Sequence, residues 1–165
     1  MAKISTVRWM ALGLALALGA PVVQAQQAPI KLGELNSYAR WAAFTVPYRN
    51  GWQLALDEIN AKGGVLGRKL EVVSREDGAT TGDATRVADE LVTREGVSLL
   101  FGSFLSNVGV AMADYANQKK IVYVAAEPLT DAITMAQGNR YTFRIRPNNY
   151  MQVGMLVDQA KASGA

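Results

Sequence analysis

The segment "GSFLSN" (Gly102 to Asn107) combines the residue types that are best suited to bind a small anion. Ser103, Ser106 and Asn107 contribute two hydroxyls and an amide. They directly precede a pattern that predicts a helix, for which Ser106 or Asn107 is the expected N-cap. Because the free N–H groups of a helix start attract negative charge, we expect neutral donors to hold a carboxylate or a carbonyl oxygen here. The alternative is that Ser106 only caps its helix.

Three aromatic residues lie earlier in the chain, in the polar segment 36–44 that predicts a loop. Tyr38, Trp41 and Phe44 are spaced by three residues, and Arg40 lies among them. Aromatic rings commonly line the pockets that bind small molecules. We therefore expect one of the three rings to contact a ligand. The alternative is that they only attach the loop to the helix that follows.

A third polar segment, "AEPLT" (Ala126 to Thr130), follows a short apolar run of strand length. Segments 36–44, 102–107 and 126–130 each come after a predicted strand. Ligands of open parallel sheets bind outside the carboxyl ends of the strands. The sequence therefore predicts a single binding site formed by these three segments.

Catalytic chemistry has little support in the composition. The chain contains no His and no Cys, which excludes a Ser-His-acid arrangement, a thiol nucleophile and His-based metal sites. The glycine-rich "GGVLGRKL" matches neither common phosphate-binding loop. Glu34 and Glu127, both at predicted strand ends, could form the carboxylate pair of a hydrolase, but only their position supports this. We expect a protein that is not an enzyme and uses no metal or cofactor.

The elements that position these segments alternate between strands and helices. Apolar runs predict strands at 30–35, 69–76, 97–101, 121–125 and 141–145. Helical patterns begin at about Pro47, at about Asp83 and after residue 106, with a short turn at 131–137 and a last helical pattern after residue 147. This alternation predicts an α/β fold, a doubly wound parallel sheet with helices on both faces.

The first 25 residues are typical of a cleaved secretory signal, with Lys3 and Arg8 before a short apolar run and a cleavage site after Ala25. That run is too short to span a bilayer. No Cys follows it, so we expect an exported, periplasmic product without a lipid anchor or disulfides. Of the 17 basic residues, 15 remain after this leader against 14 acidic ones. This balance gives no electrostatic reason to expect binding to nucleic acid or to a membrane.

Three stretches resemble a known family: "GWQLALDEINAKGGVLGRKLEVVSRED" (Gly51 to Asp77), "GSFLSN" with its helix, and "YTFRIRPNNYMQ" (Tyr141 to Gln152). They are similar to the leucine/isoleucine/valine-binding branch of the type I periplasmic solute-binding proteins, the receptors of ABC transporters. The resemblance implies two lobes with a hinge and a cleft. Residues 26–146 would form the first lobe, and residues 147–165 the crossover and first helix of a second lobe. The chain ends inside that helix, so we expect a truncated sequence.

The resemblance also implies roles for individual residues. The hydroxyl of Ser106 would bind the ligand carboxylate, with Phe104 and Leu105 beside it. The loop 125–129 would offer a carbonyl and a Thr hydroxyl to a ligand ammonium, but Pro128 stands where that Thr is expected and Thr130 is its possible substitute. The candidate ligand contacts are Tyr38, Trp41, Phe44, Ser103, Phe104, Leu105, Ser106, Asn107, Ala126, Glu127 and Thr130.

The leading hypothesis is a monomeric periplasmic receptor that delivers a small carboxylate, such as a branched-chain or other amino acid, to an ABC permease. The missing Thr and the extra rings leave an alternative open. This is a receptor of the same fold for an amide, urea or an aromatic acid, acting in transport or as a sensory module.

Overall fold

The computed structural model describes residues 27–164, so the predicted signal sequence lies outside the described residues. Five parallel strands form one sheet in the order β2-β1-β3-β4-β5. The strands are β1 (Ile30–Asn36), β2 (Leu70–Glu76), β3 (Leu99–Gly102), β4 (Val122–Ala125) and β5 (Thr142–Arg144). The interior strand β1 pairs with β2 on one side and with β3 on the other. The predicted doubly wound parallel sheet is confirmed, and its strand order reverses beside β1.

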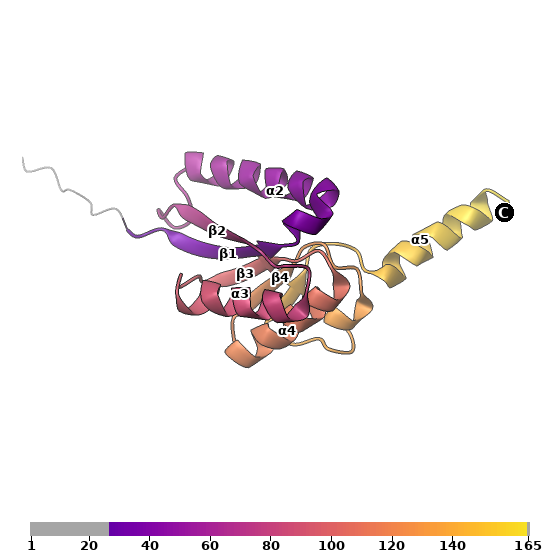
Figure 1. The fold of residues 1–165 in the computed structure, drawn as a ribbon. Coiled ribbons are helices and arrows are strands. Elements are labelled where there is room, and N and C mark those ends of the chain that lie inside the picture. The colour runs from indigo at the N-terminus through magenta and orange to yellow at the C-terminus, as the bar shows by residue number, and fades with distance from the viewer. Residues whose placement is uncertain (1–26, 165) are drawn as a thin grey trace, which may run out of the picture.

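Helices cover both faces of this sheet, as Figure 1 shows. Helix α2 (Tyr38–Ala61) lies on one face, and α3 (Thr81–Thr93) and α4 (Ser106–Lys119) lie on the other. A short 3-10 helix η1 (Asp131–Ile133) precedes β5, and α5 (Asn149–Ala162) extends away from the body. Within residues 27–164, no helix is long and apolar enough to cross a membrane.

The hydrophobic core lies between the sheet and the pair α3 and α4. Leu91 of α3, Leu100 of β3 and Met112 of α4 are fully buried there. Two close approaches depend on glycine. A Cβ at Gly33 would lie 2.9 Å from Leu100, and a Cβ at Gly109 would lie 2.6 Å from Pro128. The second contact seats α4 directly against the segment that follows β4, and so brings two predicted site segments together.

Helix α2 begins earlier than the sequence predicts. Segment 36–44, expected to be a loop, is helical from Tyr38, with a kink at Trp41 and with Pro47 inside the helix. The amide of Ala39 donates to the Glu76 carboxylate over 2.8 Å, so a residue at the end of β2 satisfies the start of this helix. The loop prediction was therefore wrong, because it treated Pro47 as the helix start and did not include a partner distant in sequence.

Candidate functional site

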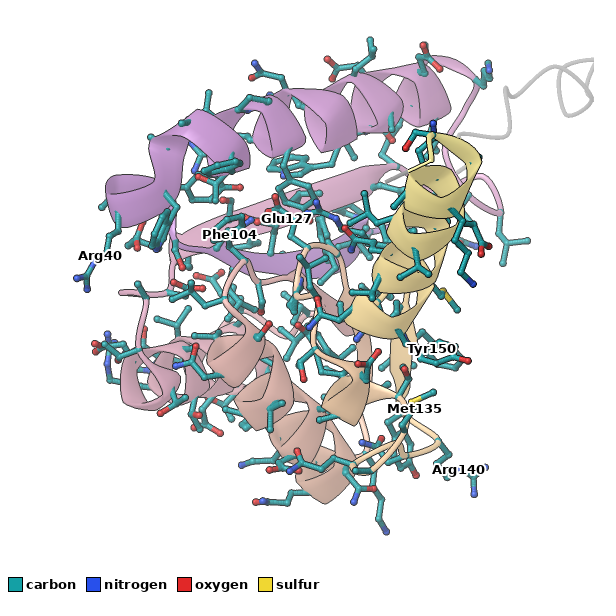
Figure 2. All side chains as sticks on the ribbon, turned by 90° about the vertical axis from the view of Figure 1, so that its right-hand side faces the viewer. Arg40, Phe104, Glu127, Met135, Arg140 and Tyr150 are labelled. Atoms are coloured by element: carbon teal, nitrogen blue, oxygen red, sulfur yellow. The ribbon has the colours of Figure 1, made fainter. Side chains whose placement is uncertain are left out.

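A pocket of about 310 Å³ lies at the carboxyl ends of the strands. Helix α2 and the segments after β3, β4 and β5 all contribute to it. The lining residues are Phe44, Phe104, Leu105, Ser106, Glu127, Leu129 and Arg146. Figure 2 shows Phe104 and Glu127 near each other below α2, while Arg40 points outward. The structure thus brings residues of all three predicted segments into one place.

Ser106 is the first residue of α4 and not its N-cap. Leu105 occupies the N-cap position, and no side chain caps the helix, so the prediction that Ser106 or Asn107 is the N-cap was wrong. The Ser106 hydroxyl accepts a hydrogen bond from the Thr130 amide over 3.3 Å instead. This leaves its O–H free to donate to a ligand in the pocket.

The other two polar candidates of this segment lie elsewhere. Ser103 adopts a left-handed conformation (φ 63°), and its amide donates to the carbonyl of Leu35 over 2.7 Å. Its side chain is fully buried, and its hydroxyl finds no partner among the described residues. Asn107 is exposed and does not line the pocket. Of the three predicted donors, only Ser106 reaches the pocket.

Two of the three candidate rings lie at the site. The Phe104 ring stacks on Phe44 with centroids 5.3 Å apart, and it is tilted against Trp41 at 5.5 Å. Tyr38 instead donates its hydroxyl to Glu34 over 2.9 Å, and the Arg49 guanidinium lies 3.5 Å above its ring. The rings of Phe44, Phe104 and Trp41 form what we call the aromatic wall. Tyr38 therefore belongs to a separate cluster with Glu34 and Arg49.

Glu127 presents a buried carboxylate to the pocket, with only 8% of the residue exposed. Of the described residues, only Asn36 donates to this carboxylate, from Nδ2 to Oε2 over 2.7 Å. Burial raises the pKa of Glu127, and the Asn36 hydrogen bond and the Arg146 charge oppose this shift. Neither Asn36 nor Arg146 is among the predicted ligand contacts, although Asn36 belongs to the predicted segment 36–44. Asn36 ends β1 and Arg146 lies two residues after β5, and this position near a strand end is the signal that could have identified them.

Hydrogen bonds from Arg144 hold the segment that follows β4 in place. Arg144 of β5 donates from Nη1 to the Pro128 carbonyl over 3.0 Å, and from Nη2 to the Thr130 carbonyl. The Thr130 hydroxyl accepts from the Ala132 amide over 3.3 Å and so caps η1. Ala126 is buried, and its amide donates to the Gly102 carbonyl over 3.0 Å. Neither Ala126 nor Thr130 lines the pocket, and their roles as ligand contacts stay predictions.

The carboxylate pair that could have served a hydrolase does not form one site. Glu34 is fully buried and bonded to the hydroxyls of Ser74 and Tyr38, and it does not line the pocket that contains Glu127. Within the described part of the chain, no group of three or more acidic residues could hold a metal ion.

Comparisons with known proteins agree with this architecture. The family model described as "Periplasmic binding protein" matches residues 17–165. Leu/Ile/Val-binding protein homolog 8 of Brucella abortus is 32% identical over 135 residues, which cover 81% of this chain and 33% of that protein. Homolog 7 of Brucella abortus is 33% identical over 137 residues, which cover 80% and 34%. The chain thus spans about a third of the length of these relatives.

Solved structures show the same likeness. The branched-chain amino acid transporter substrate-binding protein LivJ of Streptococcus pneumoniae, in complex with isoleucine, matches with a TM-score of 0.67 and 30% identity over 73% of this chain and 34% of its own. A solute-binding protein of Rhodopseudomonas palustris in complex with 4-hydroxybenzoate shares the fold, with a TM-score of 0.71 and 22% identity over 84% and 37%. With a family model that matches nearly the whole chain, and relatives of the same kind, this chain belongs to the periplasmic binding protein family.

Proposed function

We propose that this chain forms the first ligand-binding lobe of an ABC transporter's substrate-binding component. That component is a monomer in the periplasm. It captures a small carboxylate there, such as a branched-chain or other amino acid, and delivers this ligand to the permease. The observation that carries the proposal is the pocket at the strand ends, into which Ser106 projects from the start of α4. The names of the relatives, which are binding proteins, support the same function and give no support to an enzyme.

The start of α4 supplies the chemistry of capture. The first helical hydrogen bond runs from the Gly109 amide to the Leu105 carbonyl over 2.9 Å, so the three preceding amides lack helical partners. Together with the Ser106 hydroxyl, they form a neutral set of donors for a carboxylate.

We also propose that residues 26–146 form this lobe and that residues 147–165 lead into a second one. Helix α5 supports this division, because none of its residues is buried and it extends away from the sheet (Figure 1). Its exposed large apolar residues are Tyr150, Met151, Val153, Met155, Leu156 and Val157. A second lobe that packs on this helix would close over the pocket around the ligand.

Titration calorimetry of the full-length protein with amino acids and aromatic acids tests the proposal. At least one small carboxylate should bind, and Ser106→Ala should weaken that binding about tenfold or more, because a hydrogen bond to a charged group is lost. Thr85→Ala, which removes an exposed hydroxyl of α3, is the matched control and should bind as the unchanged protein does. Failure of both ligand classes to bind would refute the proposal.

A second candidate is a receptor for an aromatic acid, whether in transport or as a sensory module. The aromatic wall favours it, since Phe44 stacks on Phe104 at the pocket with centroids 5.3 Å apart and Trp41 is tilted against Phe104 at 5.5 Å. The same titration separates the candidates, because an aromatic acid without an ammonium group would then bind more tightly than leucine. Amides and urea, the remaining alternatives, belong in the same panel.

A further inference from the structure

Glu127 and Arg146 line the same pocket but do not pair with each other. Among the described residues, ion pairs join other side chains, and none connects Glu127 with Arg146 within 4.0 Å. An acid and a base that share a small cavity without contact are complementary to a ligand that carries both an acceptor and a donor group.

Glu127 is held in place with part of its bonding capacity unused. Asn36 donates to Oε2, and the Asn36 side chain is itself fixed because its Oδ1 accepts from the Ser37 amide over 2.9 Å. Of the described residues, none donates to Oε1. Among the described residues, Oε1 is not one of the buried side-chain atoms that lack a partner, so it is open to the pocket and can accept from a ligand donor.

Arg146 supplies the opposite chemistry at the exposed side of the pocket. Its planar guanidinium can bind a carboxylate with two parallel hydrogen bonds, and Ser106 lines the same pocket. The stacked rings of Phe44 and Phe104 border the same pocket. The lining therefore combines a carboxylate partner, an apolar wall and a buried acceptor.

We propose that Glu127 and Arg146 together determine specificity for an amphoteric ligand. In that ligand a carboxylate meets Arg146 and Ser106, and a hydrogen-bond donor, either ammonium or hydroxyl, meets Glu127. This inference rests on the proposed function and names the residues that select its ligand.

Matched probes test the selection in the full-length protein by titration calorimetry. Phenylalanine is compared with 3-phenylpropionate, which lacks the ammonium, and with phenethylamine, which lacks the carboxylate. 4-Hydroxybenzoate is compared with benzoate, so the two pairs distinguish an ammonium from a hydroxyl donor. In the unchanged protein, one donor-bearing carboxylate should bind about 10- to 100-fold more tightly than its donor-free counterpart.

Substitutions assign this preference to the two residues. Glu127→Gln should reduce the preference for donor-bearing over donor-free carboxylates to within about twofold. The donor-free carboxylates should bind as before, which also shows that the variant is folded. Arg146→Gln should weaken all carboxylate probes alike. Arg140→Gln, which changes an exposed arginine that points away from the pocket in Figure 2, should change nothing.

Two results would overturn the inference. The unchanged protein could bind donor-bearing and donor-free carboxylates equally well, or Glu127→Gln could keep the full preference. In either case the protein still binds carboxylates and the proposed function stands. If neither these probes nor the other amino acids and aromatic acids of the titration panel bind, the proposed function and this inference fail together.

Discussion

Glu34 of β1 and Glu127 after β4 are both buried carboxylates near the carboxyl edge of the same sheet. Glu34 accepts hydrogen bonds on both oxygens, from Tyr38 over 2.9 Å and from Ser74 over 2.6 Å. Glu127 accepts one, from Asn36, and faces the pocket. Glu34 lies within β1 and is covered by α2, whereas Glu127 lies beyond the end of β4. Although both residues lie near a strand end in the sequence, Glu34 stabilises the fold and Glu127 faces the candidate binding site.

The largest expected effect is on the pH dependence of stability through Glu34. Burial raises the pKa of Glu34 from 4.5 to about 7, although Ser74, Tyr38 and the Arg49 charge oppose the shift. Between about pH 4.5 and 7 the folded chain therefore binds more protons than the unfolded chain, and stability falls as the pH rises through this window. The loss attributable to Glu34 should be about 3 kcal/mol.

Glu34→Gln should remove this contribution, so that denaturant unfolding at pH 8 gives a more stable protein than the unchanged one. Glu71→Gln, at an exposed position of β2, is the control and should keep the original pH profile. Ligand affinity should not change in either variant. A Glu34→Gln protein with the unchanged pH profile would contradict the structural role of Glu34.

The next largest effect on stability is expected at Arg144, whose hydrogen bonds hold the segment that contains Glu127. Arg144→Ala removes the donors to the carbonyls of Pro128 and Thr130 and should lower the free energy of unfolding by about 2 kcal/mol. Arg144→Lys keeps the charge and should recover part of the loss. Because this segment carries Glu127, ligand affinity should fall in parallel with stability, as measured by unfolding and calorimetry on the same samples. Loss of stability at full affinity would show that the pocket does not depend on Arg144.

A smaller effect separates Tyr38 from the aromatic wall. Tyr38→Phe removes one donor to Glu34 and should lower stability at pH 8 by about 1 kcal/mol, while the ring remains beneath Arg49. Ligand affinity should stay unchanged in calorimetry. A clear loss of affinity would move Tyr38 back among the ligand contacts, where the sequence had suggested it.

The smallest effect on stability is expected at Phe44, which is 56% exposed. Phe44→Ala should change the free energy of unfolding by less than about 0.5 kcal/mol. Affinity for aromatic probes should fall roughly two- to tenfold, because the ring stacked on Phe104 is lost. Phe143→Ala, at an equally exposed ring of β5 outside the pocket, is the control for both measurements.

The sequence predicted the sheet well, because its strands are short apolar runs and their alternation with helices permits few topologies. The sequence also predicted that the segments after β1, β3 and β4 lie together, because the carboxyl ends of parallel strands meet at the same edge of the sheet. The remaining details depend on contacts between distant residues. The Ala39 amide at the start of α2 bonds to Glu76 at the end of β2, and Ser103 is buried with its backbone at φ 63°. Periodicity and composition contain neither signal.

Arg146 illustrates the same limit for the site. Its place in "RIRP" identifies it as the residue soon after a strand, but only the register of β5 beside β4 brings it to the pocket with Glu127. The two carboxylates were likewise indistinguishable by position. What separates them is the cover of α2 over Glu34, a tertiary property.

Titration of the two carboxylates by carbon-detected NMR, with and without ligand, tests the division of roles most directly. The full-length protein is saturated with its tightest-binding probe, and the two signals are assigned with Glu34→Gln and Glu127→Gln. Ligand should lower the pKa of Glu127, because a donor in the pocket stabilises its ionised form, while the pKa of Glu34 should stay at about 7. A ligand-dependent shift at Glu34 with none at Glu127 would contradict this division of roles.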